Sequence, residues 1–207
     1  IVGHDAVADW FRWAKDASGG ARLFWNEIHV LPETERGKAV REYTDARLRN
    51  LIDLDAPIDG FGIQGHLGIG AIPPPELVLE RLDHYAQFGL EIQFTEFDVN
   101  ILDTADPEQQ AFQADYVRDF VTAAFSHPAV TGVIYWTPYP YRWLPNSALT
   151  NKDHTLRAHG KVWQDLVTEQ WRTDERLKSD DDGSVTTRGF HGEYRITVGL
   201  PDGREFA

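Results

Sequence analysis

The chain of 207 residues contains no cysteine and no methionine. The lack of cysteine excludes a disulfide framework and a thiol nucleophile. No apolar run approaches the ~20 residues of a membrane-spanning helix, so no membrane partner is expected. Basic side chains are scarce, because 20 Lys and Arg stand against 33 Asp and Glu, for a formal charge of −13. This charge argues against nucleic acid or an anionic membrane as partner and leaves a neutral polar ligand allowed.

The composition is that of a globular chain with a core, since 42% of the residues are apolar and 12% are aromatic. The chain does not begin with methionine, and its last residues follow the turn sequence LPDG. We therefore expect it to be a segment of a longer protein. Any signal peptide would lie before Ile1.

Helical and strand patterns alternate along the body of the chain. Apolar residues at turn spacing predict helices, and short β-branched or aromatic runs predict strands. The predicted helices cover residues 4–17 and 33–53, two segments that open at the proline run 73–75 and at Pro107, and residues 156–171. The predicted strands cover residues 23–26, 58–67, 91–100 and 129–136. This order indicates βαβ units, a parallel sheet and right-handed crossovers.

The strand ends favour a barrel over an open sheet. Polar and aromatic residues gather at the carboxyl ends of the predicted strands, where a (β/α)8 barrel builds its site. They are Asn26, Glu27, Gln64, His66, Glu96, Asp98 and Trp136. A complete barrel needs about 250 residues and eight strands. We therefore predict an α/β fold in which residues 1–177 form a partial TIM barrel, equivalent to strands 5 to 8 with their helices.

The composition changes near residue 178. Short alternating runs are separated by DDG, by Gly192 and by PDG, a pattern typical of β-hairpins. Residues 178–207 are thus predicted to form a small β appendage that is too short for a core of its own.

Two carboxylates mark the strand 91–100. Glu96 and Asp98 lie two residues apart, so the period of a strand turns both side chains to one face. One interpretation is a pair of acids displayed for chemistry. The alternative is an acidic strand end that runs into a solvated loop.

Several motifs, in order, resemble the family 10 glycoside hydrolases, the endo-1,4-β-xylanases. GLEIQFTEFDV resembles their nucleophile signature on the seventh strand, with Phe97 in place of a smaller aliphatic residue. ARLFWNEIHVL, GFGIQGHL and SHPAVTGVIYW resemble the fifth, sixth and eighth strands, and YRWLPNSALTNKDHTLRAHGKVWQDLV the loop and helix after them. The tail, with TRGFHGEY, is similar to one that follows the barrel in plant-type and some bacterial members.

The resemblance implies a retaining hydrolase of β-1,4-xylan, of extracellular location and without a cofactor. In such an enzyme one carboxylate attacks the sugar and a second protonates the leaving oxygen. Glu96 matches the nucleophile, and His66 and Asp98 match partners that hydrogen-bond in line with it. A histidine at a strand end can also be purely structural. The 30-residue offset between His66 and Glu96, one βα unit, favours the functional interpretation.

Four further residues are predicted to bind the sugar. Trp136 and Trp143 resemble the two tryptophans that wall the sugar sites, and indole faces suit the C–H faces of pyranose rings. Asn26 and Gln64 would hydrogen-bond sugar hydroxyls. The alternatives are that Trp136 packs in the core and that Asn26 or Gln64 ties down a loop.

Three other patterns are set aside. Glu27 follows Asn26 as in the family's acid/base motif, but the context matches the fifth strand, where Asp is usual, and Ile28 and His29 also depart. The glycines at 60, 62 and 65 spell a dinucleotide fingerprint inside a strand, without a following helix. The eight histidines form no H-E-x-x-H motif or clustered set, so no metal is expected.

The first helix resembles the one after the fourth barrel strand, so the strand with the proton donor is expected before Ile1. The expected partners are xylan or xylo-oligosaccharide, and either the missing N-terminal half-barrel or a second copy held through open sheet edges. Two alternatives stay open. The chain acts as a non-catalytic xylan-binding module, or it belongs to an unrelated barrel hydrolase.

Overall fold

The computed structural model describes residues 4–141, 143–200 and 203–206. The chain divides into two compact units, Ile1–Trp163 and Gln164–Ala207. The predicted division between residues 177 and 178 falls inside the second unit.

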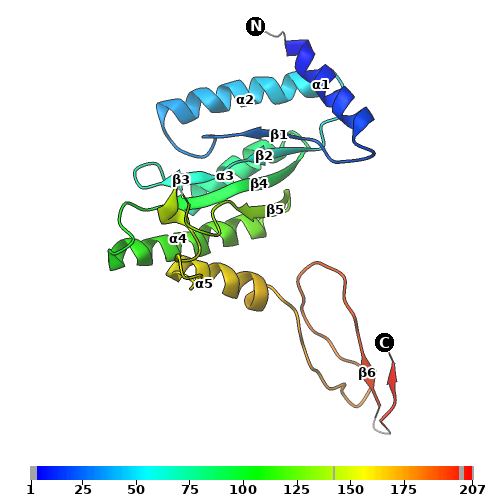
Figure 1. Cartoon of the computed structure of the whole chain (residues 1–207). Coiled ribbons are helices and arrows are strands. Elements are labelled where there is room, and N and C mark those ends of the chain that lie inside the picture. Colours follow the sequence, from blue (N-terminus) through cyan, green and yellow to red (C-terminus); the bar gives the residue numbers. More distant parts are fainter. Residues whose placement is uncertain (1–3, 142, 201–202, 207) are drawn as a thin grey trace. The chain divides into compact units, whose positions relative to one another are not determined.

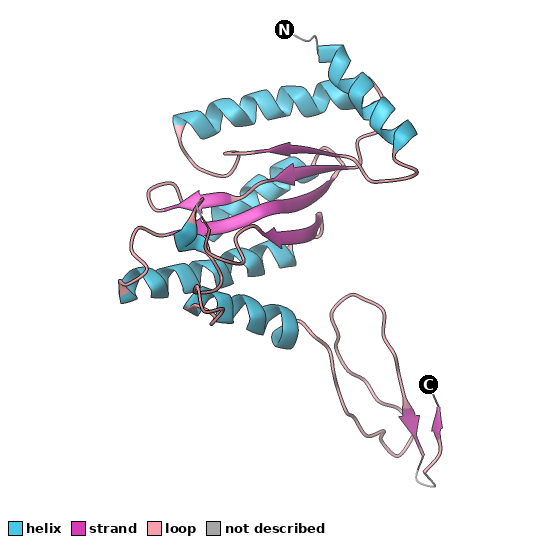
Figure 2. Ribbon diagram, viewed as in Figure 1, coloured by secondary structure: helices cyan, strands magenta, loops and turns pink. Residues whose placement is uncertain are grey.

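The first unit is a parallel sheet with helices along it (Figures 1 and 2). Its helices are α1 (His4–Ala17), α2 (Glu35–Asp53), α3 (Pro75–Ala86), α4 (Pro107–Ser126) and α5 (Ala158–Asp165), the last of which ends in the second unit, and a 3-10 turn covers Pro145–Ser147. Its strands are β1 (Phe24–Glu27), β2 (Gly60–Ile63), β3 (His66–Gly68), β4 (Glu91–Asn100) and β5 (Val130–Tyr135).

All pairings among these five strands are parallel, in the predicted chain order. β1 pairs with β2, β2 and β3 both pair with β4, and β5 pairs with β4. Because β5 takes one edge of β4, β2 and β3 share its other edge. The parallel α/β arrangement predicted from the alternation of elements is confirmed.

The single strand predicted over residues 58–67 is wrong, because the chain breaks there into β2 and β3. Gly65, between them, has φ of +80°, a left-handed conformation that glycine adopts without strain. The two halves pair with β4 in different registers, since Ile63 lies opposite Phe94 but His66 lies opposite Asp98. β4 therefore carries one more residue than its neighbour over this stretch.

The other edge of β4 shows the same irregularity. Phe94 lies opposite Val133, whereas Phe97, three residues on, lies opposite Tyr135, only two residues on. One extra residue on one strand is a β-bulge, which bends the strand and re-aims its side chains. The bulge lies between Phe94 and Phe97, the segment that holds Glu96.

Helix starts follow local capping chemistry. The Thr34 hydroxyl accepts a hydrogen bond from the Gly37 amide at 3.0 Å before α2. The Asp106 carboxylate accepts from the amides of Glu108 and Gln109 at the start of α4. Pro107 follows at the first helical position, where the missing N–H costs nothing.

An aromatic layer joins β4 to α4. The Phe97 and Phe120 rings stack with centroids 4.2 Å apart, and the Phe94 ring meets Phe120 edge-on at 4.9 Å. All three side chains are fully buried. This layer takes up the helix-facing side of β4 and leaves its other side for the polar residues.

The second unit has little regular structure. Its described part pairs β6 (Val198–Gly199) with β7 (Glu205–Phe206), antiparallel, on either side of the PDG turn. The further hairpins predicted for the tail are wrong for these residues, because the DDG turn near Asp180 is not flanked by strands. A two-stranded hairpin is marginal without a packed apolar face, and the side chains here are exposed.

The α-helical part of the last helix is shorter than the predicted range of residues 156–171. α5 ends at Asp165, and a π-helical turn covers Leu166–Gln170. No helix in the described ranges is both long enough and apolar enough to cross a membrane.

Candidate active site

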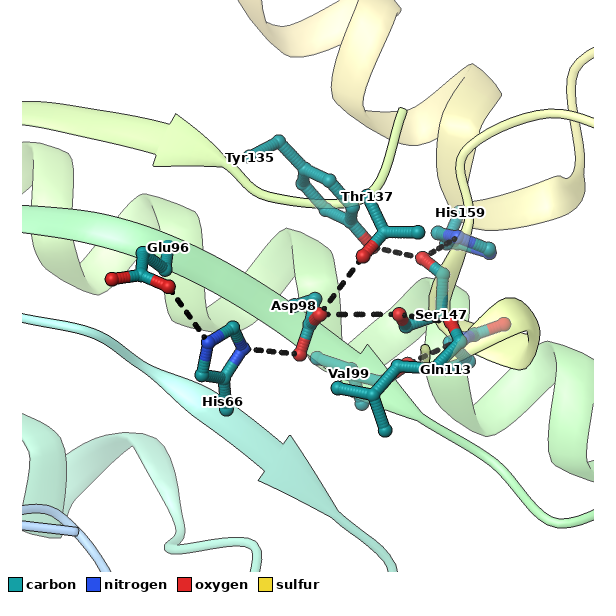
Figure 3. A network of polar contacts seen from close by, with 10 residues as sticks. His66, Glu96, Asp98, Val99, Gln113, Tyr135, Thr137, Ser147 and His159 are labelled. Carbon is teal, nitrogen blue, oxygen red and sulfur yellow. Dashed lines mark hydrogen bonds and ion pairs between the residues drawn. The ribbon is translucent and has the colours of Figure 1, made fainter. Parts of the chain in front are cut away.

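Two carboxylates and one imidazole form the centre of the candidate site. Glu96 and Asp98 extend from β4, and His66 extends from the start of β3 on the adjacent edge (Figure 3). His66 Nε2 lies 3.1 Å from Glu96 Oε2, and His66 Nδ1 lies 3.1 Å from Asp98 Oδ1. The bulge in β4 turns both carboxylates toward the same ring, so one imidazole bridges them.

Burial differs along this trio. The Asp98 side chain is 0% exposed, that of His66 8% and that of Glu96 20%. Burial alone lowers the pKa of His66, but the hydrogen bonds and negative charges of Asp98 and Glu96 outweigh it, and the net pKa is raised above 6.5. An imidazolium donates to both carboxylates. Glu96 is therefore accessible to solvent, whereas Asp98 is enclosed and contacts His66 from the buried side.

Hydroxyl groups surround the second oxygen of Asp98. Thr137 Oγ1 and Ser147 Oγ lie 3.1 and 3.2 Å from Asp98 Oδ2. The Tyr135 hydroxyl donates to the Ser147 carbonyl at 2.8 Å, and His159 Nε2 lies 3.2 Å from the same oxygen. These contacts connect the loop after β5 to the carboxylate network.

The polar network ends at His159 on α5. Burial lowers the pKa of His159 to about 4, the charge of Arg157 acts in the same direction, and the hydrogen bond to Ser147 opposes them. The ring is 1% exposed. His159 is therefore neutral at pH 7 and donates its single Nε2 proton to the Ser147 carbonyl.

The predicted sugar-contacting amides take different positions. Asn26 Nδ2 lies 3.4 Å from Glu96 Oε1, and the Thr95 hydroxyl donates to Asn26 Oδ1 at 2.8 Å. The absence of a side chain at Gly62 leaves room for Asn26, since a Cβ there would come within 2.6 Å of Asn26 Oδ1. Gln64 follows β2 directly, and its carbonyl accepts from the Glu96 amide at 2.9 Å.

The two predicted tryptophans stand beside His66. The Trp143 and Trp136 ring centroids lie 4.6 and 5.9 Å from that of His66, both edge-on. The two indoles are 6.3 Å apart at 86° to each other. Trp136 and Trp143 are 39% and 47% exposed, so both offer indole surface next to His66, the hydrogen-bond partner of Glu96.

A sequence profile of glycosyl hydrolase family 10 matches residues 1–158. The chain belongs to glycosyl hydrolase family 10. It is 30% identical over 195 residues to endo-1,4-beta-xylanase 2 of Arabidopsis thaliana, covering 94% of the chain and 17% of that protein. Its fold matches that of xylanase 10B from Thermotoga petrophila, solved with xylobiose, with a TM-score of 0.72 at 21% identity, covering 82% of the chain.

The chain thus spans a small part of its curated relatives and 53% of the xylanase 10B chain. This supports the predicted partial (β/α)8 barrel. One further relative is not named as a xylanase. The anti-sigma-I factor RsgI6 of Acetivibrio thermocellus is 33% identical over 146 residues, covering 70% of this chain and 18% of that protein.

Glu27, the residue set aside as proton donor, lies on the other side of β1 from Asn26. Trp25 packs against the cluster of Val7, Ala8 and Leu51 on the helix side. Because side chains alternate along a strand, Glu27 shares that side with Trp25. Its Oε1 accepts from the Ile28 amide at 3.0 Å.

The sequence analysis missed the residues behind Asp98. Thr137 follows Trp136 directly, so its place after a predicted strand was an available signal. Ser147 lies in the 3-10 turn and His159 in α5, and only the tertiary structure brings Ser147 to Asp98 and His159 to the Ser147 carbonyl. Within the described ranges, no three or more His, Cys, Asp or Glu side chains are grouped as a metal site.

Proposed function

We propose that this chain is part of a retaining glycoside hydrolase that cleaves internal β-1,4 bonds of xylan, with Glu96 as the nucleophile. One observation carries the proposal: a part-exposed carboxylate is held by His66 and Asn26 beside two exposed indoles. Family membership and the names of its relatives supply the substrate class.

The proposed chemistry requires Glu96 to be ionised and fixed in orientation. His66, as an imidazolium, donates to Glu96 Oε2 and stabilises the negative charge. A Glu96 oxygen then attacks the anomeric carbon while the bond to the leaving oxygen breaks and that oxygen takes a proton from the acid/base carboxyl group. Water later cleaves the glycosyl ester, which restores Glu96 and retains the anomeric configuration.

Covalent trapping tests the role of Glu96. A 2-fluoro xylobioside with an activated leaving group should add one glycosyl mass to the chain, and peptide mapping should locate it on Glu96. Glu96→Gln should abolish the label. Glu76→Gln, an exposed carboxylate at the start of α3, is the matched control and should keep it. Labelling on another residue, or none at all, would contradict the proposal.

The proposal places the acid/base carboxylate outside this chain. Retaining enzymes hold their two carboxyl groups about 5–5.5 Å apart across the scissile bond. Glu27 shares the strand face of Trp25, opposite that of Asn26, and its carboxylate accepts a hydrogen bond from the Ile28 amide. Both observations argue against Glu27 as the partner of Glu96.

The chain alone should therefore act weakly. General-acid assistance contributes about 10²–10⁴-fold, and a good leaving group does not need it. We expect slow turnover of an activated aryl xylobioside, lost in Glu96→Gln, and no cleavage of xylan until the acid/base part of the barrel is supplied. Robust xylan cleavage by the chain that Glu27→Gln abolishes would refute this assignment.

A non-catalytic xylan-binding module is the second candidate, favoured by the two partly exposed indoles. The exposed Trp136 and Trp143 would then form a binding surface. Isothermal titration with xylohexaose separates the two functions. Equal binding by the chain and by Glu96→Gln, without covalent trapping in either, would favour the binding module.

A further inference from the structure

We propose that Thr137 is a positioning residue for the candidate nucleophile: its buried hydroxyl orients Asp98, and Asp98 acts through His66 on Glu96. The catalytic consequence rests on the proposed function. The effect on His66 does not, because it follows from the contacts alone.

The Thr137 hydroxyl donates its hydrogen bond to Asp98. The side chain is 0% exposed, and its Oγ1 donates to Asp98 Oδ2 at 3.1 Å. The described ranges show no other acceptor for this hydroxyl. Asp98 Oδ1 lies 3.1 Å from His66 Nδ1, so one oxygen of the buried carboxylate contacts His66 and the other contacts Thr137.

Ser147 is a weaker second donor because its one proton has two acceptors. Its Oγ lies 3.2 Å from Asp98 Oδ2 and 2.8 Å from the Leu144 carbonyl. A hydroxyl donates one hydrogen bond at a time. The shorter distance favours Leu144, so the Asp98 charge depends chiefly on Thr137 and His66.

The consequence of these contacts appears when His66 loses a proton. Asp98 then remains as a buried charge beside a neutral imidazole with a single N–H, so it depends more on its hydroxyl donors, and a buried carboxylate with fewer donors is less stable. Removing the Thr137 hydroxyl makes this deprotonated state more costly. His66 should therefore keep its second proton to a higher pH.

The other charged groups near His66 are few. Glu96 and Asp98 face it from β4. The pKa of His29, after β1, is lowered first by burial, then by the charge of Arg36, and His66 acts in the same direction. Tyr135 lies near Asp98, and burial keeps its pKa well above 10, so it remains neutral. A change at Thr137 alters none of these groups directly.

The test is an NMR titration of His66 in the 207-residue chain, with the resonance assigned by its loss in His66→Gln. Thr137→Val keeps the side-chain shape without the hydroxyl and should raise the pKa of His66 by about half to one unit. Thr137→Ser restores the donor and should return the value to that of the parent chain. Ser147→Ala should give a smaller shift than Thr137→Val.

The control is Thr131→Val, because the Thr131 hydroxyl donates to Glu91 near the start of β4, away from the site. It should leave the pKa of His66 unchanged. An unchanged pKa in a folded Thr137→Val variant, an equal shift in Thr131→Val, or no recovery in Thr137→Ser would overturn the proposal. If Thr137→Val does not fold, Thr137→Ala, which also lacks the hydroxyl, takes its place with the same expected and refuting outcomes.

A second measurement links Thr137 to Glu96. The rate of covalent labelling by the activated 2-fluoro xylobioside should fall about tenfold in Thr137→Val, with affinity for xylo-oligosaccharide unchanged, and recover in Thr137→Ser. An unchanged rate would overturn the link to Glu96. Absence of labelling in the parent chain would count against the proposed function, while the His66 titration would still decide the role of Thr137.

Discussion

Acid should destabilise this protein through one buried histidine. His159 is 1% exposed, and burial lowers its pKa to about 4 from the ordinary 6.5. In the unfolded chain the imidazole binds a proton near pH 6.5, whereas in the folded chain it does so only near pH 4. Because the unfolded state holds more protons between these values, the stability that His159 contributes is lost as the pH falls below 6.5.

The expected loss follows from the shift in pKa. The difference between about 4 and 6.5, at about 1.36 kcal/mol per pH unit, corresponds to a loss of about 3 kcal/mol once the pH is below 4. pH 5 lies about 1.5 pH units below the unfolded-state pKa of 6.5, so the loss of stability there is about 2 kcal/mol.

The assay is urea unfolding at pH 7.0, 6.0 and 5.0, followed by circular dichroism and tryptophan fluorescence. His159→Gln keeps an N–H donor for the Ser147 carbonyl but does not titrate. The stability of the parent chain minus that of the variant should therefore fall by about 2 kcal/mol between pH 7 and pH 5. His191→Gln, at an exposed position in the second unit, is the control and should show no such trend. Parallel pH profiles for the parent and His159→Gln would refute the reasoning.

Three further predictions concern packing and assembly. Phe97→Ala should lower the free energy of unfolding by about 3–5 kcal/mol, because the ring is fully buried and stacked on Phe120, whereas Phe97→Leu should cost less in the same denaturant titration. Gly60→Ala should destabilise the chain by about 1–3 kcal/mol, because a Cβ there would overlap the Phe24 ring, and a melting temperature equal to that of the parent would show that the ring moves aside. Among the described strands β1 pairs only with β2 and β5 only with β4, so these open edges should cause concentration-dependent association, and a stable monomer in sedimentation velocity at high concentration would contradict this.

The element order and the parallel sheet could be predicted because each depends on local pattern. The helix over residues 4–17 and the strand over residues 91–100 have the predicted bounds. Their apolar residues recur at the period of the element, and glycines lie at their ends. The change of phase in β4, with apolar residues at 92 and 94 and then at 97 and 99, was already visible in the sequence.

The meaning of that phase change became clear only from the neighbouring strands. A bulge is defined by register against partners, and the partners of β4 come from segments about 30 residues before it and almost 40 residues after it. The bulge brings Glu96 and Asp98 to one imidazole. The same limit explains the error at residues 58–67, where Phe61, Ile63 and Leu67 keep one alternation across Gly65 and conceal the break.

By itself the sequence determined the α/β class, the strand that carries Glu96 and Asp98, and the resemblance that led to family 10, because these depend on residue type and spacing along the chain. The tertiary structure decided which groups hold the carboxylates. Thr137, after a strand, and Ser147, in a 3-10 turn, contact Asp98, and His159 on a helix contacts the Ser147 carbonyl. Glu27 lies on the opposite side of its strand from Asn26. Such contacts depend on how distant segments pack. The position of a hydroxyl or an imidazole in the sequence does not show which carboxylate it will contact.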